Sequence, residues 1–392
     1  MQASGRIRLL HCITSLDADG AQHMLLKLCQ HMKQDEFEHI VLNLRSSSEF
    51  AKRFAAIGVP VINIGMRSSL PTVAASRAIR EAIKTFSPDI IQGWMYHGNI
   101  AATLGHLFAK SSTPLLWNIR KAVENPKEYR PLTRMTLKLG AFLSSRPKKV
   151  IYCGNYVAEQ HIKLGYSLNN TAVIYNGFDT DLFAPAPTHY QALRSRLGLP
   201  SDVKLVGMTA RFHPHKDHLN FLKCAAIVAK AHPKTHFLLA GRGLSSDNQA
   251  LQKMLSQVDL KNNLHLLGER SDVPQILPAL DVYCQSSSAE GFPNALGEAM
   301  ACGVPCVSTN AGASAEAIGD CGKIVEINDH EALAQAVIEM LSLPNEQRTL
   351  LSSRMHQRVL KNFSLAVIAT QYEDCYLDVL GRSRTECESV YG

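Results

Sequence analysis

The chain has 392 residues, more than one hydrophobic core usually organises, which predicts two domains of about 200 residues each. Apolar residues make up 46% and charged residues 19%, a composition that excludes a largely disordered or fibrous chain. The formal charge of +7 is compatible with an anionic substrate, a phospholipid surface or nucleic acid, and does not choose among them.

The first half alternates short apolar, β-rich runs with segments of helical period, as expected of a parallel sheet covered by helices on both faces. The expected strands cover residues 7–13, 39–45, 60–65, 89–95, 114–120, 149–154 and 171–177. After the stretch DLFAPAPTHY the alternation restarts, with expected strands at 204–210, 235–241, 264–268, 282–286, 305–310 and 323–327. The sequence therefore predicts two doubly wound α/β domains.

Two prolines, Pro185 and Pro187, mark the expected linker, because proline fixes φ, removes a donor and keeps the preceding residue extended. We place the first domain at residues 1–182 and the second at 183–363. Ser364 is a good N-cap for a last helix that Gly381 can end, and we expect residues 364–392 to pack back on the first domain. Ligands of open α/β sheets bind beyond the carboxyl ends of the strands, and two such sheets face to face would form a deep cleft.

The sequence shows no sign of a signal peptide, a membrane span or a complete metal-binding motif. The start MQASGRIRLLHCITSLDADG lacks the apolar core of a signal peptide, and no apolar run reaches the roughly 18 residues of a membrane span, so we expect a cytoplasmic protein. Ten cysteines without regular spacing indicate reduced core residues. Cys302 and Cys306 suggest half of a metal site, but no second pair accompanies them, so we expect no bound metal.

Two loops at strand ends carry residues suited to anion binding. The loop SLDADGAQHMLLKL leads through Gly20 into an amphipathic helix whose N-terminus could receive a phosphate or a sugar, although a plain helix-opening turn explains one glycine as well. In the second domain, TARFHPHKD offers Arg211 and Lys216 before a helix. Two permanent cations at a strand end suit a diphosphate in binding and as it departs, although basic loop residues are often only solvated.

The most specific segment is AEGFPNALGEAMACGVPCV, in which Glu290 and Glu298 flank seven residues. Asn294 resembles an N-cap, so Glu290 would stand in the loop and Glu298 about one turn into the helix, both near its positive end. Two carboxylates at one mouth can bind hydroxyl groups. The surrounding apolar run predicts a largely buried helix, in which a carboxylate needs partners.

Taken together, these segments resemble the retaining glycosyltransferases of family 4, which share the GT-B fold of two facing Rossmann-like domains with a cleft between them. The resemblance runs nearly end to end, through DGAQHMLLKL, WMYHGNIAA, VIYNGFDTDLF, GMTARFHPHKD, FLLAGRG and EGFPNALGEAMACGVP. The chain departs from the family where Asp19 replaces the first of two common glycines and Gln22 stands where Glu is frequent. Contacts from that loop to the donor phosphates are therefore in doubt.

The resemblance implies a role for each matched residue. Glu298 would bind the ribose hydroxyls, Arg211 and Lys216 the donor diphosphate, and Glu290 the hydroxyls of the donor sugar. His97, after the fourth strand, would lie near the reacting centre. The expected catalytic residues are His97, Arg211, Lys216 and Glu290, and the expected donor-binding residues are Gly20, Arg211, Lys216, Glu290, Gly291, Phe292, Pro293, Asn294 and Glu298.

The same resemblance implies transfer with retention of configuration, from a nucleotide-sugar to a glycan or lipid-linked acceptor, without a cofactor or metal. Uridine is the preferred base, and assembly of a bacterial surface polysaccharide or lipopolysaccharide is the preferred pathway. We treat the Asp-x-Asp triplets at 17–19 and 179–181 as incidental, and we expect no nucleic-acid partner.

Other functions on related folds stay open. A sugar-nucleotide epimerase or hydrolase, or a phosphorylase, would keep the donor site, and a non-catalytic nucleotide-sugar-binding subunit would keep the fold without turnover. An NAD-dependent enzyme is disfavoured, because no G-x-G-x-x-G follows the first strand.

A separate basic segment, YRPLTRMTLKLGAFLSSRPKKV, places Arg130, Arg134 and Lys138 at helical spacing beside apolar residues. The pattern is typical of a surface helix that engages anionic lipid, but a core helix with a solvated basic face fits it equally well. Residues 130–149 are therefore a candidate for peripheral contact with the inner face of the plasma membrane.

Overall fold

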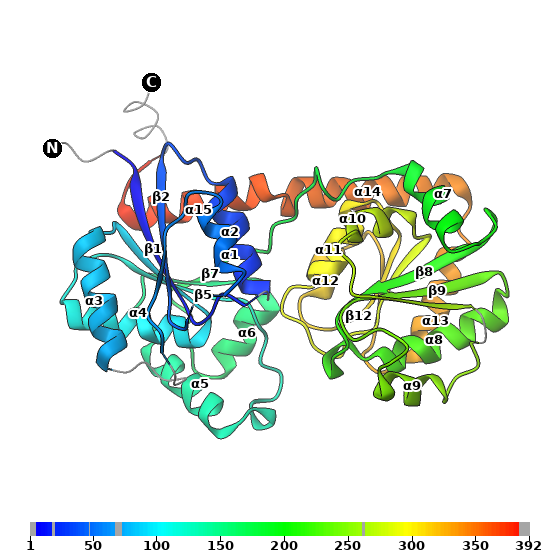
Figure 1. Ribbon diagram of the computed structural model, residues 1–392, viewed down its shortest axis with the longest axis horizontal. Coiled ribbons are helices and arrows are strands. Elements are labelled where there is room, and N and C mark those ends of the chain that lie inside the picture. Colours follow the sequence, from blue (N-terminus) through cyan, green and yellow to red (C-terminus); the bar gives the residue numbers. More distant parts are fainter. Residues whose placement is uncertain (1–4, 18–19, 47, 67–72, 261–262, 384–392) are drawn as a thin grey trace. The chain divides into compact units, whose positions relative to one another are not determined.

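The computed structural model describes residues 5–17, 20–46, 48–66, 73–260 and 263–383. The chain divides into two compact units, the first running to Gly177 and resuming at Leu365, the second running from Phe178 to Ser364. Each unit holds one parallel sheet with helices on both of its faces (Figure 1). This confirms the two doubly wound α/β domains predicted from the alternation of strand and helix patterns.

The sheet of the first unit has the strand order β3-β2-β1-β4-β5-β6-β7, and every neighbouring pair is parallel. Its strands are β1 (Ile7–Ile13), β2 (Phe37–Asn43), β3 (Val61–Asn63), β4 (Ile90–Trp94), β5 (Leu115–Ile119), β6 (Lys149–Tyr152) and β7 (Thr171–Val173). The strand order reverses between β1 and β4, so the loops after these two strands flank the point where such sheets bind ligands.

The helices of the first unit are α1 (Gly20–His31), α2 (Ala51–Ala55), α3 (Val73–Phe86), α4 (Met95–Ala109), the 3-10 turn η1 (Pro126–Glu128), α5 (Pro131–Leu143), α6 (Asn155–Lys163) and α15 (Leu365–Leu380). Helices α1, α2 and α15 share one apolar core with the sheet. Helices α3, α4 and α5 contact one another in series.

The last helix, α15, is an integral part of the first unit. Tyr376 Oη donates to Gln92 Oε1 at 2.6 Å, and Tyr372 Oη accepts from Asn118 Nδ2 at 2.6 Å and from Arg120 Nη2 at 2.8 Å. Both tyrosines are fully buried. These bonds join the last helix of the chain to strands β4 and β5 of the first sheet.

The C-terminus of α15 ends as the sequence indicates. Gly381 has a φ of +66°, and the Arg382 N–H donates to Leu377 O at 2.9 Å. A left-handed residue after the last turn with this backward hydrogen bond is the usual glycine stop of a helix.

The sheet of the second unit has the order β10-β9-β8-β11-β12-β13, again with parallel neighbours. Its strands are β8 (Lys204–Thr209), β9 (Thr235–Ala240), β10 (Leu264–Gly268), β11 (Val282–Gln285), β12 (Cys306–Thr309) and β13 (Lys323–Val325). Here the order reverses between β8 and β11, so the ligand-binding edge is expected after these two strands.

The helices of the second unit are α7 (Pro187–Arg196), η2 (Pro214–Lys216), α8 (His218–Ala231), α9 (Gln249–Leu255), α10 (Val273–Ile276), η3 (Leu277–Ala279), α11 (Asn294–Ala301), α12 (Ser314–Ile318), α13 (His330–Leu341) and α14 (Asn345–Phe363). Helices α8 and α13 share an apolar core with the sheet, and α11 packs against α12 and α14. In the described part of the chain, no helix is both long and apolar enough to span a membrane.

The boundary between the units lies earlier than the sequence indicates. The predicted boundary follows residue 182, but the second unit begins at Phe178, which is 1% exposed and whose ring packs on Gly297 of α11. The Phe178 N–H also donates to Phe363 O at 2.8 Å. The two prolines taken as the linker lie inside the second unit, where Pro187 opens α7, because proline suits the first turn of a helix.

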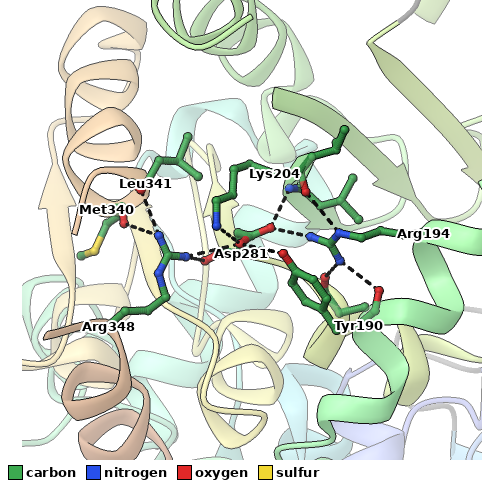
Figure 2. Close-up of polar contacts among 10 residues, drawn as sticks. Tyr190, Arg194, Lys204, Asp281, Met340, Leu341 and Arg348 are labelled. Carbon is green, nitrogen blue, oxygen red and sulfur yellow. Dashed lines mark hydrogen bonds and ion pairs between the residues drawn. The ribbon is translucent and has the colours of Figure 1, made fainter. Parts of the chain in front are cut away.

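A buried carboxylate ties four elements of the second unit together (Figure 2). Asp281, just before β11, accepts from Arg194 Nη2 of α7 at 2.6 Å and from Lys204 Nζ of β8 at 3.0 Å. Arg348 of α14 approaches the same carboxylate at 3.5 Å, and its other nitrogen donates to Leu341 O. Because Asp281 is 5% exposed, these cations compensate a charge that would otherwise be costly to bury.

Candidate active site

The residues singled out in the second domain follow the two strands that flank the reversal of its sheet. Lys216 ends the turn η2 after β8, and Glu290 lies in the loop after β11. Since β8 and β11 are neighbours, their loops meet at the carboxyl edge of the sheet. The strand order therefore brings together two residues that are far apart in the sequence.

Lys216 and Glu290 form an ion pair, with 2.5 Å between Nζ and Oε1. Ser287 Oγ donates to the same Oε1 at 2.7 Å. The side chains of Lys216 and Glu290 are 25% and 10% exposed, so the pair is shielded yet reachable from solvent. Two donors converge on one oxygen of the carboxylate and fix its orientation.

The backbone of the Lys216 loop is held by hydrogen bonds from the β11 side. Ser286 Oγ donates to Lys216 O at 3.0 Å and to Asp217 O at 2.9 Å, and the Ser288 N–H donates to His215 O at 2.8 Å. Asp217 has a φ of +43° and accepts from the Asn220 N–H, which starts α8. The ammonium of Lys216 is thus placed by a loop with little freedom to move.

Two glycines allow the loops of this edge to pack closely. A Cβ on Gly241, at the end of FLLAG, would overlap Ala210 O in the loop that precedes Arg211. A Cβ on Gly312 would overlap Glu290 O, and both glycines have positive φ. The weak motif FLLAGRG therefore has a packing role, because it supports the loop that carries the two basic residues.

Helix α11 carries the second glutamate. The helix begins at Asn294 with Pro293 as its N-cap residue, and no side chain caps it. The interpretation of Asn294 as the N-cap was wrong by one residue, because Pro293 is extended, with a ψ of 95°, and takes the capping position. Glu298 lies one turn into the helix and is half-buried, as predicted from the apolar run around it.

Both glutamates contribute to the electrostatics around a buried tyrosine of β11. Burial holds the pKa of Tyr283 above its ordinary range, and Cys306, Glu290 and Glu298 act in the same direction. Burial, and then Glu298, raise the pKa of Cys302 to about 12. Both carboxylates thus act on the fully buried Tyr283 of β11.

The segment between the glutamates is anchored by aromatic packing. Phe292 is 5% exposed, and its ring centroid lies 6.1 Å from that of Phe178 and 5.4 Å from that of Phe363. Gly291 is half-buried, and its carbonyl accepts from the Ala313 N–H at 3.0 Å. The backbone from Phe292 to Asn294 therefore enters α11 in a fixed position, at the end where helix N–H groups lack intrahelical partners.

Arg211 lies in the loop that follows β8. It follows β8 by two positions, and its side chain is exposed. The next residue is fixed, because the Phe212 N–H donates to Arg242 O at 2.8 Å. The structure places Arg211 on the same loop as Lys216.

The other two expected residues belong to the first unit and flank the reversal of its own sheet. Gly20 is the first residue of α1, after β1, and His97 lies in the first turn of α4, after β4. A Cβ on Gly98 would lie 2.5 Å from Cys12 O, so the glycine beside His97 lets α4 approach β1 closely. Burial, and then the charge of Arg45, lower the pKa of His97, which favours the neutral ring.

The glycine loop departs from the family pattern at two positions. Gln22 is buried, and its Nε2 donates to Ser15 O at 3.0 Å, so this side chain holds the loop after β1. Asp19, the other departure, lies outside the described residues.

The family of the chain follows from comparison with known proteins. The model for glycosyl transferases group 1 matches residues 190–357, and the model for glycosyltransferase family 4 matches residues 18–182. Together they extend over both units. The chain belongs to the family 4 glycosyltransferases of the GT-B fold.

Relatives of this glycosyltransferase serve polysaccharide and lipopolysaccharide assembly. It is 28% identical over 213 residues to the Escherichia coli UDP-Gal:alpha-D-GlcNAc-diphosphoundecaprenol alpha-1,3-galactosyltransferase, a match that covers 53% of this chain and 54% of that protein. It is 31% identical over 189 residues to the lipopolysaccharide core biosynthesis glycosyltransferase LpsE of Rhizobium meliloti, covering 48% of this chain and 52% of that one. The matches thus span about half the length of these relatives.

A solved structure supports the fold over most of the chain. Anabaena HepE in complex with UDP superposes with a TM-score of 0.82 at 22% identity, and the match covers 94% of this glycosyltransferase and 99% of HepE. At that identity the likeness establishes the GT-B fold alone.

One group of residues in the described part of the glycosyltransferase has the composition of a metal site: His11, Cys29 and His39. His11 Nε2 lies 3.0 Å from His39 Nδ1, and Trp94 Nε1 donates to His11 Nδ1 at 3.2 Å. Burial lowers the pKa of both histidines, so they are neutral hydrogen-bonding partners. Because Cys29 and Trp94 belong to the apolar core, we assign the group to packing of the first unit.

The triplet at 179–181 has a structural role. Asp179 Oδ1 accepts from the N–H groups of Asp181 and Leu182, at 3.2 and 2.9 Å, and so caps a turn. The triplet at 17–19 lies partly outside the described residues.

Sequence reasoning did not identify the serines that orient the site. Ser286 and Ser287 are the first two serines of the run QSSS that begins at the last residue of β11, and their hydroxyls bind the Lys216 backbone and the Glu290 carboxylate. Three consecutive serines at a strand end are the signal that could have indicated them. The contact of Ser286 with Lys216 could not be read from the sequence, because it depends on β8 lying beside β11.

Proposed function

We propose that this protein is a retaining glycosyltransferase that moves a sugar from a UDP-sugar to a glycan or lipid-linked acceptor. The observation that carries the proposal is the ion pair between Lys216 and Glu290, fixed by Ser287, at the reversal of the second sheet. An ammonium and a carboxylate at that edge suit a ligand with a diphosphate beside a sugar.

The two basic residues of the β8 loop would hold the diphosphate. Lys216 is positioned by its bond to Glu290, and Arg211 is exposed on the same loop. Negative charge grows on the bridging oxygen as the nucleoside diphosphate departs, so two cations at this edge would stabilise the transition state more than the ground state. This charge compensation would be the main catalytic contribution of the second unit.

The two glutamates would divide the remaining contacts. The described donors to Glu290 converge on Oε1, and Oε2 would accept from the hydroxyls of the donor sugar. The N–H groups from Phe292 to Asn294, at the start of α11, would add donors for the sugar or phosphate oxygens. Glu298, one turn further, would accept from the ribose hydroxyls.

The first unit would supply the acceptor side. His97 is half-buried after β4 and is held neutral, so one ring nitrogen can accept and the other can donate a hydrogen bond to the transferred sugar. Departure of the diphosphate leaves an oxocarbenium-like sugar, and the acceptor attacks from the same face while a phosphate oxygen takes its proton. This course retains the configuration and needs no protein nucleophile.

Two comparisons support the identity of the substrates. HepE was solved with UDP, and the Escherichia coli relative is named for a UDP-Gal donor and a diphosphoundecaprenol acceptor. A uridine donor and a lipid-linked acceptor in surface polysaccharide or lipopolysaccharide synthesis therefore form the leading hypothesis.

The test is a donor panel with UDP-glucose, UDP-galactose, UDP-GlcNAc, UDP-GalNAc and GDP-mannose, followed as slow hydrolysis by wild type and Glu298→Gln. We expect one donor to be consumed, and the variant to lose most of that activity. Proton NMR of the released or transferred sugar should show the anomer of the donor. An isomerised donor without transfer would favour an epimerase, and binding of a donor without any consumption would favour a non-catalytic subunit.

Metal independence has its own test. We assign the donor phosphates to the side-chain cations Arg211 and Lys216, so we expect the activity to survive EDTA. A strict requirement for added Mn²⁺ would contradict the proposed charge compensation by Arg211 and Lys216.

A further inference from the structure

Helix α5 exposes a stripe of large apolar side chains. Leu132, Met135, Leu139 and Phe142 are 42%, 51%, 37% and 77% exposed. Successive helical residues turn by about 100°, so these four positions fall within about 80° of arc. Scattered exposed leucines are ordinary, but four large apolar residues in one line on one helix are not.

The other side of α5 is packed, so the stripe cannot turn inward. Thr136, Leu137, Gly140 and Leu143 are buried. A Cβ on Gly140 would overlap Tyr166 Oη, which shows how closely this side fits its neighbour. A core helix with a solvated basic face accounts for the packed side alone and leaves the apolar stripe unexplained.

The loop before β7 places another exposed leucine near the end of α5. Leu168 in that loop is 65% exposed. The Ser167 N–H donates to Ser144 Oγ, and Asn170 Nδ2 donates to Ser144 O, both at 2.8 Å. Since Ser144 directly follows α5, these bonds hold Leu168 near the end of the helix that carries Phe142.

Positive charge borders the stripe. Arg134 and Lys138 are exposed on α5, on the side of the stripe away from the packed face, and Arg130 precedes the helix. Arg146 and Lys148 are exposed just after it, and residues 130–149 contain no Asp or Glu. The segment thus presents apolar side chains beside cations, with no acidic residue of its own.

We propose that this surface, defined by the four apolar residues with Arg134 and Lys138 and called the α5 surface, docks the protein on an anionic phospholipid bilayer. The cations would lie at the headgroup phosphates while the apolar side chains enter the boundary with the acyl chains. The charged residues of this segment are all positive, which favours an anionic lipid surface. A protein partner would usually be matched by charges of both signs around the contact. The inference does not depend on the donor proposal.

The experiment is co-sedimentation with vesicles of phosphatidylethanolamine and phosphatidylglycerol, compared with vesicles of phosphatidylcholine alone. Wild type should bind the anionic vesicles and dissociate at high salt. Removal of one charge costs about fivefold in partitioning, so Arg134→Gln with Lys138→Gln should weaken binding about 30-fold. Phe142→Ser should weaken it by at least about tenfold.

Matched variants control for general effects. Arg80→Gln with Lys84→Gln removes two exposed cations with the same spacing from α3, and Leu350→Ser removes an exposed leucine from α14. Both should bind vesicles as wild type does. Equal losses in the control and α5 variants would overturn the proposal, as would wild type that does not bind anionic vesicles.

A spectroscopic test reports insertion directly. Trp94 and Trp117 are buried, so the exposed indole of Phe142→Trp would be the reporter at the membrane. Its emission should shift to the blue with anionic vesicles and be quenched by brominated lipids. An indole that stays solvated in sedimented samples would contradict insertion. If the protein is instead a dimer without lipid, and the α5 variants dissociate that dimer, the surface belongs to a contact with a second copy of the chain.

Discussion

Removal of the Lys216 ammonium should test two roles of its ion pair with Glu290: local stability of the site and binding of the nucleotide. In Lys216→Met, the carboxylate of Glu290 keeps its place with 10% of its side chain exposed, and Ser287 still donates to it. Breaking a fully buried pair costs about 3–5 kcal/mol, and the partial exposure of Lys216 lowers this to about 1–2 kcal/mol. The double variant with Glu290→Gln should recover most of that loss, because no uncompensated charge remains.

Hydrogen exchange measures this cost locally, which is preferable to a global melting curve in a two-unit chain. Peptides covering 213–217 and 286–293 should exchange faster in Lys216→Met than in the double variant. Lys253→Met, a change at an exposed lysine of α9, is the control and should exchange as wild type does. Equal exchange in the single and double variants would refute the coupling.

The same variants should differ in nucleotide binding. A charge-assisted hydrogen bond is worth about 1.5–3 kcal/mol, so Lys216→Met should weaken UDP binding about 10- to 150-fold by calorimetry. Glu290→Gln should leave UDP affinity within about threefold and weaken the UDP-sugar, because Glu290 is assigned to the sugar. Lys216→Met that binds UDP as tightly as wild type would refute the placement of the diphosphate.

Other parts of the fold make further predictions. Asp281→Asn removes the charge opposite the buried Arg194 and should destabilise the second unit by about 3–5 kcal/mol; a Tm within a degree or so of wild type would contradict the role of this carboxylate. Gly297→Ala forces a Cβ into the Phe178 ring, so it should lower the stability of the second unit by about 1–3 kcal/mol and weaken UDP binding. Adding Phe178→Leu should restore part of both losses. Additive losses in the double variant would count against the contact. Burial lowers the pKa of His161 to about 4 from its ordinary 6.5. The stability that the neutral ring provides is therefore present above pH 6.5 and lost as the pH falls to about 4. His161→Gln should flatten the pH dependence of the unfolding free energy in that window, and an unchanged slope would exclude His161 as its source.

Strand patterns predicted where the strands lie along the chain and their approximate bounds, because short apolar runs bounded by turns are typical of buried parallel strands. The predicted bounds were wrong where a side chain, and not the backbone of a neighbouring strand, makes the hydrogen bond. The seventh strand was expected to reach residue 177 but ends at Val173, where Arg120 Nη1 donates to Ile174 O at 2.6 Å. A hydrogen bond from Arg120, which follows another strand, is invisible to local patterns.

The candidate site was predicted in part, for a similar reason. Motif spacing identified Lys216 and Glu290, but their contact requires β8 beside β11, and strand order is not encoded locally. The cap at Asn294 was misplaced because Pro293 and Asn294 both suit a helix start. The domain boundary was misplaced because prolines that suit a linker also suit the first turn of a helix such as α7.

The assignment of Glu298 to the ribose is the most direct test of the nucleotide-sugar site. Calorimetry with UDP and 2′,3′-dideoxy-UDP should show that wild type, and the exposed control Glu346→Gln, bind UDP at least about tenfold more tightly than the dideoxy nucleotide. Glu298→Gln should bind both weakly and nearly equally. If wild type binds neither nucleotide, or if Glu298→Gln keeps the full preference for UDP, the donor site does not lie where this account places it.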